Sequence, residues 1–556
     1  MTILDLNQLD GAAGISADLC IVGAGAAGIS IALQFIGTGI DVVLLESGGR
    51  VAEAATQSLY EGTVADERLH AAPEHYRQRR FGGSTTIWGG RCIPFDPIDF
   101  EKRDYIPDSG WPISFQDLVP YYGQANRLCE AGEFAYTVEQ AFRRPLRPVI
   151  EGFESENFSI DSLERFSCPT DFGARYGHEI ERASNIQAIL HANVTDLKLD
   201  ADGRAVVAAT ARSLRGRAIV VRARQFVLAT GGLEVARLLL ANRDIHPTGI
   251  GNQGDAVGRY YMCHLAGTLG TIRFRGPLSS VWHGYEVAED GTYCRRRFAL
   301  RETVQRRFGL ANFVGRLHHP RIIDPQHRSS VLSLLFLAKY LIPYEYRTRL
   351  HGSEPTTLAA FSQHLRNVIL DPGSAISFAW HMLRDRKLAK RKFPSIIVRS
   401  RENIYSLDFH AEQRPSAASR VTLGETRDRL GVPRLHIDWR YEEGDLNTVC
   451  RSIELFAADI QRCKLGLFQY DPASVEQEMV RYGAYGGHHI GTARMGTDHR
   501  KSVVDADCRV HSVRNLYIAS AATFPTSGQA NPTLTVVALS LRLADHVKSK
   551  LKSAGN

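Results

Sequence analysis

The sequence lacks several features that define whole classes of protein. Its nine cysteines lie far apart and form no C-x-x-C pair, which argues against a disulfide framework, an iron–sulfur cluster or a zinc cluster. The N-terminus shows no basic segment followed by an apolar one, so we expect no export signal. The longest apolar run, Val331 to Ile342, is well short of the ~20 residues that a membrane-spanning helix needs. A reduced, cytoplasmic setting is therefore expected.

A strong charge of one sign is also absent. The 556 residues carry a formal net charge of +7, with lysine and arginine scattered along the chain, so no nucleic-acid partner is expected. Two local basic clusters stand out, Arg295 to Arg307 and Arg384 to Lys392. The apolar content of 44% is ordinary for a globular protein. A chain of this length can bury a large core without disulfides.

The clearest motif lies near the start of the chain. A strand predicted at Asp18 to Val22 runs into the turn Gly23-Ala24-Gly25-Ala26-Ala27-Gly28, and a helical pattern follows through Ile36. A second strand, Asp41 to Leu45, then ends in Glu46. This order of strand, G-x-G-x-x-G, helix, strand and acidic residue predicts a dinucleotide site.

Each part of the motif suits a dinucleotide for a physical reason. Gly23 permits the tight turn, Gly25 lets the backbone approach a pyrophosphate, and Gly28 lets the helix pack closely on the strand. The helix N-terminus presents free N–H groups to the phosphates. Glu46 can accept hydrogen bonds from the ribose hydroxyls and would repel a 2′-phosphate, which disfavours NADP. A second G-x-G-x-x-G, Gly249 to Gly254, lacks a flanking strand and helix, so we interpret it as a loop.

Three later segments favour a flavin over a nicotinamide. The first is Arg80 to Gly90 (RFGGSTTIWGG), whose glycines and small hydroxyls suit close backbone approach to a flat ring. The second is Phe226 to Gly232 (FVLATGG), predicted as a strand and turn before a helix at Leu233 to Ala241. The third is the C-terminal series NLYIAS, FP and GQANPT between Asn515 and Thr533.

On these residues the sequence resembles the glucose–methanol–choline (GMC) oxidoreductases over about 1–260 and 405–556. GTARMG at Gly491 to Gly496 and GQANPTLT at Gly528 to Thr535 are most similar to the pyranose 2-oxidase branch. The resemblance implies an α/β fold. A non-contiguous Rossmann-like FAD-binding domain would span 1–260 and 485–556, with excursions into the substrate domain around 90–180. The substrate domain itself would span 261–484. That second domain would be an antiparallel sheet covered by helices.

The resemblance also assigns cofactor contacts. Val194 would meet adenine through its backbone, Ala229 to Gly231 would lie near the adenine half, and Ser84 and Thr85 would lie near the pyrophosphate and flavin. The full set of implied FAD-binding residues is Gly23, Ala24, Gly25, Ala26, Ala27, Gly28, Glu46, Ser84, Thr85, Val194, Ala229, Thr230, Gly231, Ala519, Ser520 and Thr533.

Two positions depart from the family pattern. Pyranose 2-oxidases carry a histidine that bonds covalently to the flavin where this chain has Ile87. An isoleucine cannot form that bond, so a non-covalent FAD is predicted. Ser520 stands where many family members have aspartate, which affects details of the flavin pocket only.

The family pattern H-x-x-G-T selects His488 as the catalytic histidine, with Asn531 as its partner. Histidine titrates near neutral pH, so a neutral imidazole can take the hydroxyl proton while hydride leaves the alcohol carbon. The amide of Asn531 would hold the same hydroxyl oxygen. His489 would point elsewhere if the segment is extended. His264 and His410 stand outside any motif, and we interpret both as structural.

The middle of the chain, about 260–405, resembles the family least, so the sequence says little about the substrate. Ala375 to Leu388 is predicted to be helical, and Lys387 to Lys392 is basic. The segment 331–392 is either a plain helical cover or a surface that docks on a membrane or a redox partner. Alternating residues between Val421 and Trp439 predict strands of a sheet, expected to form one wall of the active site.

The sequence therefore predicts an FAD-dependent enzyme that oxidises an alcohol, with a sugar or glycoside favoured by the resemblance. Oxygen, a quinone or a redox protein could accept the electrons. Two alternatives stay open: a flavin-bound lyase of the same fold, and a flavoprotein dehydrogenase subunit that passes electrons to a partner at a membrane. No metal ligands are predicted.

Overall fold

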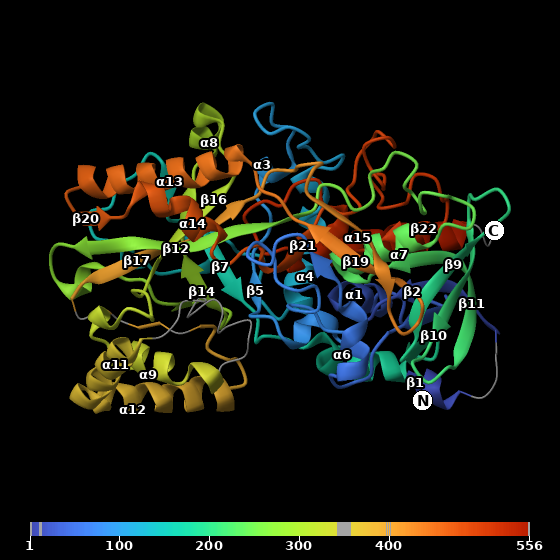
Figure 1. The fold of residues 1–556 in the computed structure, drawn as a ribbon, viewed down its shortest axis with the longest axis horizontal. Coiled ribbons are helices and arrows are strands. Elements are labelled where there is room, and N and C mark those ends of the chain that lie inside the picture. The colour runs from blue at the N-terminus through green and yellow to red at the C-terminus, as the bar shows by residue number, and fades with distance from the viewer. Residues whose placement is uncertain are drawn as a thin grey trace.

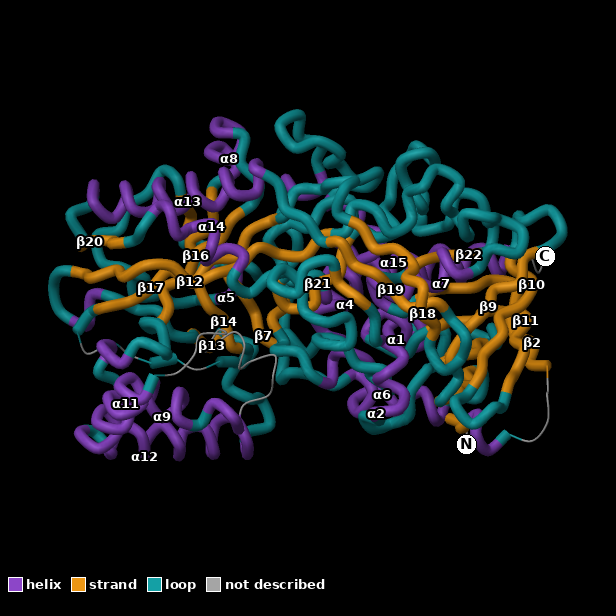
Figure 2. The backbone as a smooth tube through the Cα atoms, in the orientation of Figure 1, coloured by secondary structure: helices purple, strands orange, loops and turns teal. Residues whose placement is uncertain are grey.

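The computed structural model describes residues 3–9, 14–341, 357–395, 397–398, 400 and 402–553. Two large sheets lie along the long axis of the molecule, an eight-stranded one at the right of Figure 1 and a seven-stranded one at the left. Figure 2 shows that helices cover both regions, and that long irregular segments fill the space between them. The predicted α/β fold class is confirmed.

The eight-stranded sheet is the predicted nucleotide-binding layer. Its order is β1-β8-β3-β2-β11-β10-β9, with β22 also paired to β11. Pairing is parallel from β1 to β11 and for β22, whereas β9 and β10 are antiparallel. The strands are β1 (Ile3–Asp5), β2 (Gly14–Val22), β3 (Val42–Leu45), β8 (Ile186–Leu190), β9 (Asn193–Leu199), β10 (Val206–Arg212), β11 (Ala218–Leu228) and β22 (Leu516–Ile518).

Helices cover this sheet because the parallel strands are apolar on both faces. The C-terminal helix α15 packs against α1 and α4, and α6 also packs against α1. The bounds are α1 (Ala26–Leu33), α4 (Val119–Leu128), α6 (Phe172–Arg182), α7 (Gly231–Ala241) and α15 (Thr533–Ser553). The C-terminal helix therefore closes a layer that the N-terminal strands of the chain begin.

The first crossover, β2–α1–β3, has the geometry that its glycines predict. A Cβ on Gly28 would lie 1.9 Å from the carbonyl oxygen of Gly23, so only glycine lets α1 pack this closely on the turn. Two boundaries differ from the prediction. Strand β2 begins at Gly14, because the long strand β11 pairs with it from there, and α1 ends at Leu33 instead of continuing to Ile36.

The seven-stranded sheet has the order β20-β12-β17-β16-β15-β6, with β21 also paired to β12, and all its pairings are antiparallel. Helix α13 covers β16, β17 and β20, and α14 packs on β12. The elements are β6 (Phe158–Ser159), β12 (Met262–Phe274), β15 (Phe298–Leu300), β16 (Phe313–His318), β17 (Ile404–Glu412), β20 (Gly466–Gln469), β21 (Tyr485–Ile490), α13 (Glu443–Arg462) and α14 (Val475–Val480).

The predicted strands between Val421 and Trp439 form, but their position was predicted wrongly. They are β18 (Arg420–Arg427) and β19 (Pro433–Asp438), which form a small sheet with β4 (Thr63–Val64) and pack against α7. Alternation reveals a strand with one buried face but not what covers that face. Here the buried side chains of Val421, Leu435 and Ile437 lie away from the active-site cavity described below.

A separate bundle of three helices lies beneath the seven-stranded sheet (Figure 1). It contains α9 (Ser330–Leu337), α11 (Leu358–Leu370) and α12 (Pro372–His381), which continues as a π-helical turn over Met382–Leu388. The helix predicted at Ala375 to Leu388 is therefore confirmed, whereas residues 342–356 of the segment lie outside the described residues. Among the described helices, none is both long and apolar enough to cross a bilayer. Gly249 to Gly254 is an irregular turn, as expected.

Candidate active site

A cavity of about 460 Å³ lies where the first glycine-rich turn meets β21 and the start of α15. His488 and Asn531 both line it. Fourteen of the sixteen predicted cofactor residues line it too: Gly23, Gly25, Ala26, Ala27, Glu46, Ser84, Thr85, Val194, Ala229, Thr230, Gly231, Ala519, Ser520 and Thr533. Segments from both ends of the chain therefore surround one cavity.

The other two predicted residues lie just behind the wall. The backbone N–H of Ala24 donates to Glu46 Oε2 over 2.9 Å, and Gly28 forms the close contact between α1 and the turn. The second carboxylate oxygen of Glu46 accepts from the N–H of Gly48, also at 2.9 Å. Two backbone donors thus fix the carboxylate at the end of β3, where it faces the cavity.

The loop that holds Ser84 and Thr85 is a short 3₁₀ turn at Gly83–Thr86. The Thr85 hydroxyl donates to the carbonyl of Gly82 over 2.6 Å and accepts from the N–H of Phe172 over 3.1 Å. Its hydroxyl is therefore used to hold the loop in place. Ile87, the residue at the family's covalent position, also lines the cavity.

A buried charge cluster that the sequence did not reveal lies on the same wall near Val194. The Glu234 carboxylate accepts from Arg77 and Arg79 and pairs with Arg237. Burial raises the pKa of Glu234, but these three guanidinium groups outweigh burial and lower it to about 2. Arg79 also donates to Asn193 Oδ1 over 3.0 Å, beside Val194.

His488 lies between two partners. It stands on β21, and its Nε2 is 3.1 Å from the Asn531 amide nitrogen, just before α15. Its Nδ1 is 2.8 Å from Nδ1 of His264 on β12. Strands β12 and β21 are paired, which brings the two histidines together across 224 residues of sequence. We expected His264 to be structural; the structure shows in addition that it contacts the predicted base directly.

The hydrogen bonds assign the protons on both rings. The Ser527 carbonyl can only accept, so His264 Nε2, 3.2 Å away, carries a proton and donates. In a neutral His264 the Nδ1 then has a lone pair and accepts from Nδ1–H of His488. Nε2 of His488 is consequently the unprotonated nitrogen. It accepts from the Asn531 amide and faces the cavity.

Burial keeps His488 neutral. Its pKa is held well below 6.5, first by burial and then by the neighbouring His264 and Arg91. Burial also lowers the pKa of His264 to about 4. Both rings are therefore neutral at physiological pH, and Nε2 of His488 can take a proton if a substrate hydroxyl replaces the Asn531 amide as its hydrogen-bond donor.

His410 packs against this pair. Its ring stacks on His264 with centroids 4.4 Å apart, and its Nδ1 donates to the Gln529 carbonyl over 2.6 Å. The nitrogens of His264, His410 and His488 lie within 4.8 Å of one another, close enough for a metal ion. Both nitrogens of His264 and of His488 are already in hydrogen bonds, so a metal ion would have to displace them. His489 is directed away from the pair, toward His70 and Tyr261, as predicted.

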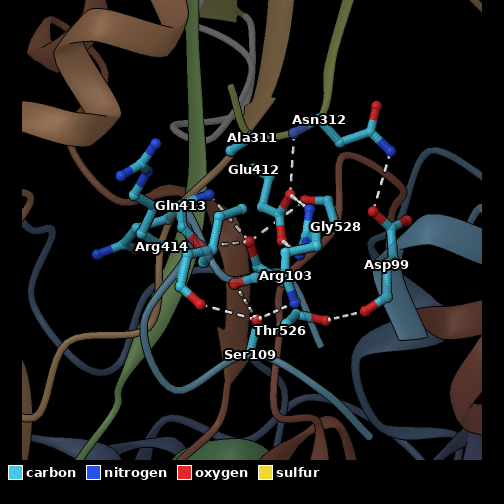
Figure 3. Close-up of polar contacts among 12 residues, drawn as sticks. Asp99, Arg103, Ser109, Ala311, Asn312, Glu412, Gln413, Arg414, Thr526 and Gly528 are labelled. Carbon is cyan, nitrogen blue, oxygen red and sulfur yellow. Dashed lines mark hydrogen bonds and ion pairs between the residues drawn. The ribbon is translucent and has the colours of Figure 1, made fainter. Parts of the chain in front are cut away.

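A buried polar network anchors the loop that presents Asn531 (Figure 3). Thr526 donates to the backbone carbonyl of Asp99 over 2.7 Å, and Gly528 packs so closely that a Cβ would lie 2.8 Å from an Asp99 carboxylate oxygen. Arg103 makes two bonds to Glu412, at 2.8 and 2.6 Å, and both side chains are fully buried. Glu412 is the β17 partner of His264 in the sheet register, so this ion pair lies directly behind the histidines.

The C-terminal part of the chain, residues 415–540, matches the family model described as GMC oxidoreductase. The resemblance to the GMC oxidoreductases is confirmed. It is 26% identical to 6'''-hydroxyparomomycin C oxidase of Streptomyces lividus over 97% of this chain and 93% of that protein. The predicted likeness to pyranose 2-oxidases is confirmed by a 38% identical match to the Tricholoma matsutake enzyme, over 31% of each chain.

The fold of this chain is also found in a solved structure. Formate oxidase from Aspergillus oryzae RIB40, in a form that carries a mutation affecting FAD modification, aligns with a TM-score of 0.54. The alignment covers 98% of this chain and 100% of that chain at 17% sequence identity. At that level of identity the likeness establishes the fold alone.

GMC oxidoreductases are FAD flavoproteins, and the cavity fits that cofactor. Space is open above Gly25 and Gly231, where a backbone can approach phosphates without a side chain between them. Two buried polar atoms on the cavity wall, Thr230 Oγ1 and Asn531 Oδ1, have no hydrogen-bond partner among the described residues. Buried polar atoms of this kind are expected to bond a ligand.

Proposed function

We propose that this GMC oxidoreductase oxidises a secondary or primary alcohol group of a sugar or glycoside. One observation carries the proposal: an unprotonated imidazole nitrogen of His488 and the amide of Asn531 lie 3.1 Å apart on the wall of a dinucleotide cavity. One group can take a hydroxyl proton and the other can hold the hydroxyl oxygen. The names of the two relatives, a hydroxyparomomycin oxidase and a pyranose oxidase, support a sugar-like substrate.

In the proposed reaction the two side chains separate, and the substrate hydroxyl replaces the hydrogen bond between them. It donates to Nε2 of His488 and accepts from the amide N–H of Asn531. When the proton moves to His488, the alcohol carbon is prepared to lose a hydride, and bound FAD supplies the hydride acceptor. His264 keeps Nε2 of His488 unprotonated before the substrate binds, and the amide of Asn531 holds the substrate hydroxyl oxygen in place. General-base catalysis of this kind raises the reaction rate roughly 10²–10⁴-fold.

Part of the cavity lining suits a carbohydrate. Trp88, Tyr285 and Tyr482 give it aromatic surface, and Arg91 gives it a charged donor. Aromatic rings pack against the apolar C–H face of a sugar, whereas polar groups bond its hydroxyls, so this lining favours a sugar ring over a simple alkyl alcohol.

We further propose that FAD is held without a covalent bond, because Ile87 occupies the wall position where a histidine could attach it. Acid precipitation of the yellow enzyme tests this. The flavin is expected in the supernatant, and flavin retained in the pellet would refute non-covalent binding.

An anaerobic screen of sugars, glycosides and simple alcohols tests the function directly. A substrate should bleach the flavin absorbance in the wild type. The His488→Ala variant should bind flavin but lose most of this reduction, whereas His499→Ala, a change at an exposed histidine, should behave as wild type. Normal flavin reduction in His488→Ala would contradict the assignment of His488 as the catalytic base. If no alcohol bleaches the flavin, the lyase alternative gains support.

A further inference from the structure

Exposed apolar side chains are concentrated on one part of the surface. Eighteen large hydrophobic residues are exposed among those described, and eleven of them lie between Tyr340 and Leu388. The other seven are scattered over the rest of the chain, as is normal for a globular protein. A concentration of this kind marks an interaction surface.

The exposed residues follow the outer faces of α11 and α12. On α11 they recur at helical spacing, and the exposed set is Leu358, Phe361, Leu365, Ile369 and Leu370. On α12 and its π-helical extension the set is Ile376, Trp380, Leu383 and Leu388. Trp380 is 60% exposed and Leu358 is 89% exposed. Spacings of three to four residues from Leu358 to Ile369 and from Ile376 to Leu383 place these side chains on one stripe of each helix.

The opposite faces of the same helices pack inward. Both α11 and α12 pack on α9, whose Leu332, Leu335 and Phe336 are buried. His364 of α11 is buried against this core, where it bonds Ser333 over 3.0 Å and stacks on Phe336. The bundle therefore already has a core, and the exposed apolar residues on the outer faces are not part of it.

Basic side chains border the apolar stripes. Between Leu358 and Lys392 the chain has seven lysines and arginines against two aspartates. Of these, Arg366, Arg384, Lys387, Lys390 and Lys392 are exposed. An in-plane helix with an apolar face and a cationic border is the pattern of proteins that lie on anionic bilayers.

We propose that this face, formed by α11 and α12 with their lysine border, docks on an anionic membrane surface. The apolar stripes would enter the headgroup boundary, with Trp380 at the level that tryptophan favours in membranes. The lysines would meet lipid phosphates. Lysine is depleted at protein–protein interfaces, which disfavours a protein partner. A second copy would bring two surfaces of the same positive charge together.

The docking face connects directly to the active site. After α12 the chain reaches Arg391, whose guanidinium donates to the carbonyls of Glu130 and Phe166. Three residues later Pro394 lines the catalytic cavity, as does Phe166. A bilayer under the bundle would thus lie next to the cavity rim, and a lipid-dissolved reactant could approach from it.

Flotation of the holoenzyme with vesicles tests the proposal. It should float with vesicles of phosphatidylcholine and phosphatidylglycerol, and much less with phosphatidylcholine alone or at high salt. Ile376→Ser combined with Trp380→Ser, or Lys387→Glu combined with Lys390→Glu, should weaken binding by about tenfold. The matched control is Leu278→Ser combined with Leu467→Ser, which changes exposed apolar residues elsewhere and should float as wild type.

Three outcomes would overturn the proposal. These are no flotation with anionic vesicles, unchanged flotation of both test variants, and a concentration-dependent dimer by light scattering that Ile376→Ser abolishes. Flavin reduction in solution is measured on the same preparations and should be unchanged in the docking variants. A failure of the proposed chemistry would then be distinguished from a failure of docking.

Discussion

His264 and His488 face each other through their Nδ1 atoms, which are 2.8 Å apart. Only one of these nitrogens can carry the proton of that bond. The Ser527 carbonyl decides which, because it requires a proton on the far nitrogen of His264. A backbone oxygen on the far side of His264 thereby leaves the cavity-facing nitrogen of His488 with a lone pair.

Replacing His264 should therefore slow the chemical step more than it weakens binding. We expect His264→Phe to reduce the rate of flavin reduction about 10–100-fold, a part of the roughly 10²–10⁴-fold that a general base contributes, with little change in KM. His264→Gln offers an amide oxygen to Nδ1–H of His488 and should recover part of the rate. Stopped-flow reduction measures both. Equal losses in the two variants would point to a purely structural role.

His264→Phe should also shift the pH dependence of kcat/KM. His264 helps to lower the pKa of His488, so its removal should raise that pKa and shift the acid limb of kcat/KM to higher pH. An unchanged acid limb in His264→Phe would contradict the direct contact.

In the wild type the acid limb should lie well below pH 6.5. His488 works as a base only while neutral, and burial keeps its pKa well below that ordinary value. Activity is therefore retained as pH falls through 6.5 and is lost only when the lowered pKa is reached. Rates of anaerobic flavin reduction between pH 4 and 8 would show this. A half-loss at or above pH 6.5 would mean that His488 is more solvated than its burial implies.

Glu46→Gln should weaken FAD binding without abolishing the fold. The N–H groups of Ala24 and Gly48 hold the carboxylate at the cavity wall. The amide keeps the size of the side chain but loses the charge that would accept from the ribose hydroxyls of FAD. Hydrogen bonds to charged groups contribute about 1.5–3 kcal/mol, so the Kd for FAD should rise about 10–100-fold. Fluorescence titration of the apoprotein measures it, and Glu61→Gln on the half-exposed side chain outside the cavity serves as control. A similar Kd in both variants would remove Glu46 from the cofactor site.

Breaking the Arg103–Glu412 pair should strongly destabilise the protein. Both side chains are fully buried, so Arg103→Met leaves a carboxylate without its partner in the core and should reduce the free energy of unfolding by about 3–5 kcal/mol. Arg103→Met combined with Glu412→Leu removes both charges and should be less destabilised than either single variant. Urea unfolding compares them. A double variant that is the least stable of the three would show that the bond of Glu412 to the Asn312 backbone N–H matters more than the charges.

The parts of the site that residue spacing alone predicts are local in the chain, whereas His488 and Asn531 were predicted by the family resemblance. Gly23 to Gly28 and Glu46 lie within one crossover, where spacing alone fixes the geometry. His264 could not be found this way, because its role depends on the pairing of β12 with β21, and no local pattern encodes that register. The same limit explains why β18 and β19 were predicted as strands but assigned to the wrong wall. The division into domains at 260 and 485 and the roles of the cofactor residues stay predictions.

Helix α15 packs against α1, and this contact has a consequence for how the enzyme is made. A ribosome that has synthesised only the first half of the chain has produced the glycine-rich turn but not Asn531, Thr533 or the helix that follows them. Folding during synthesis proceeds from the N-terminus. The nascent protein can therefore form only one wall of the FAD cavity and cannot enclose the cofactor. FAD can therefore be bound fully only when translation is nearly finished. A prematurely terminated chain would lack both His488 and the C-terminal wall of the FAD cavity.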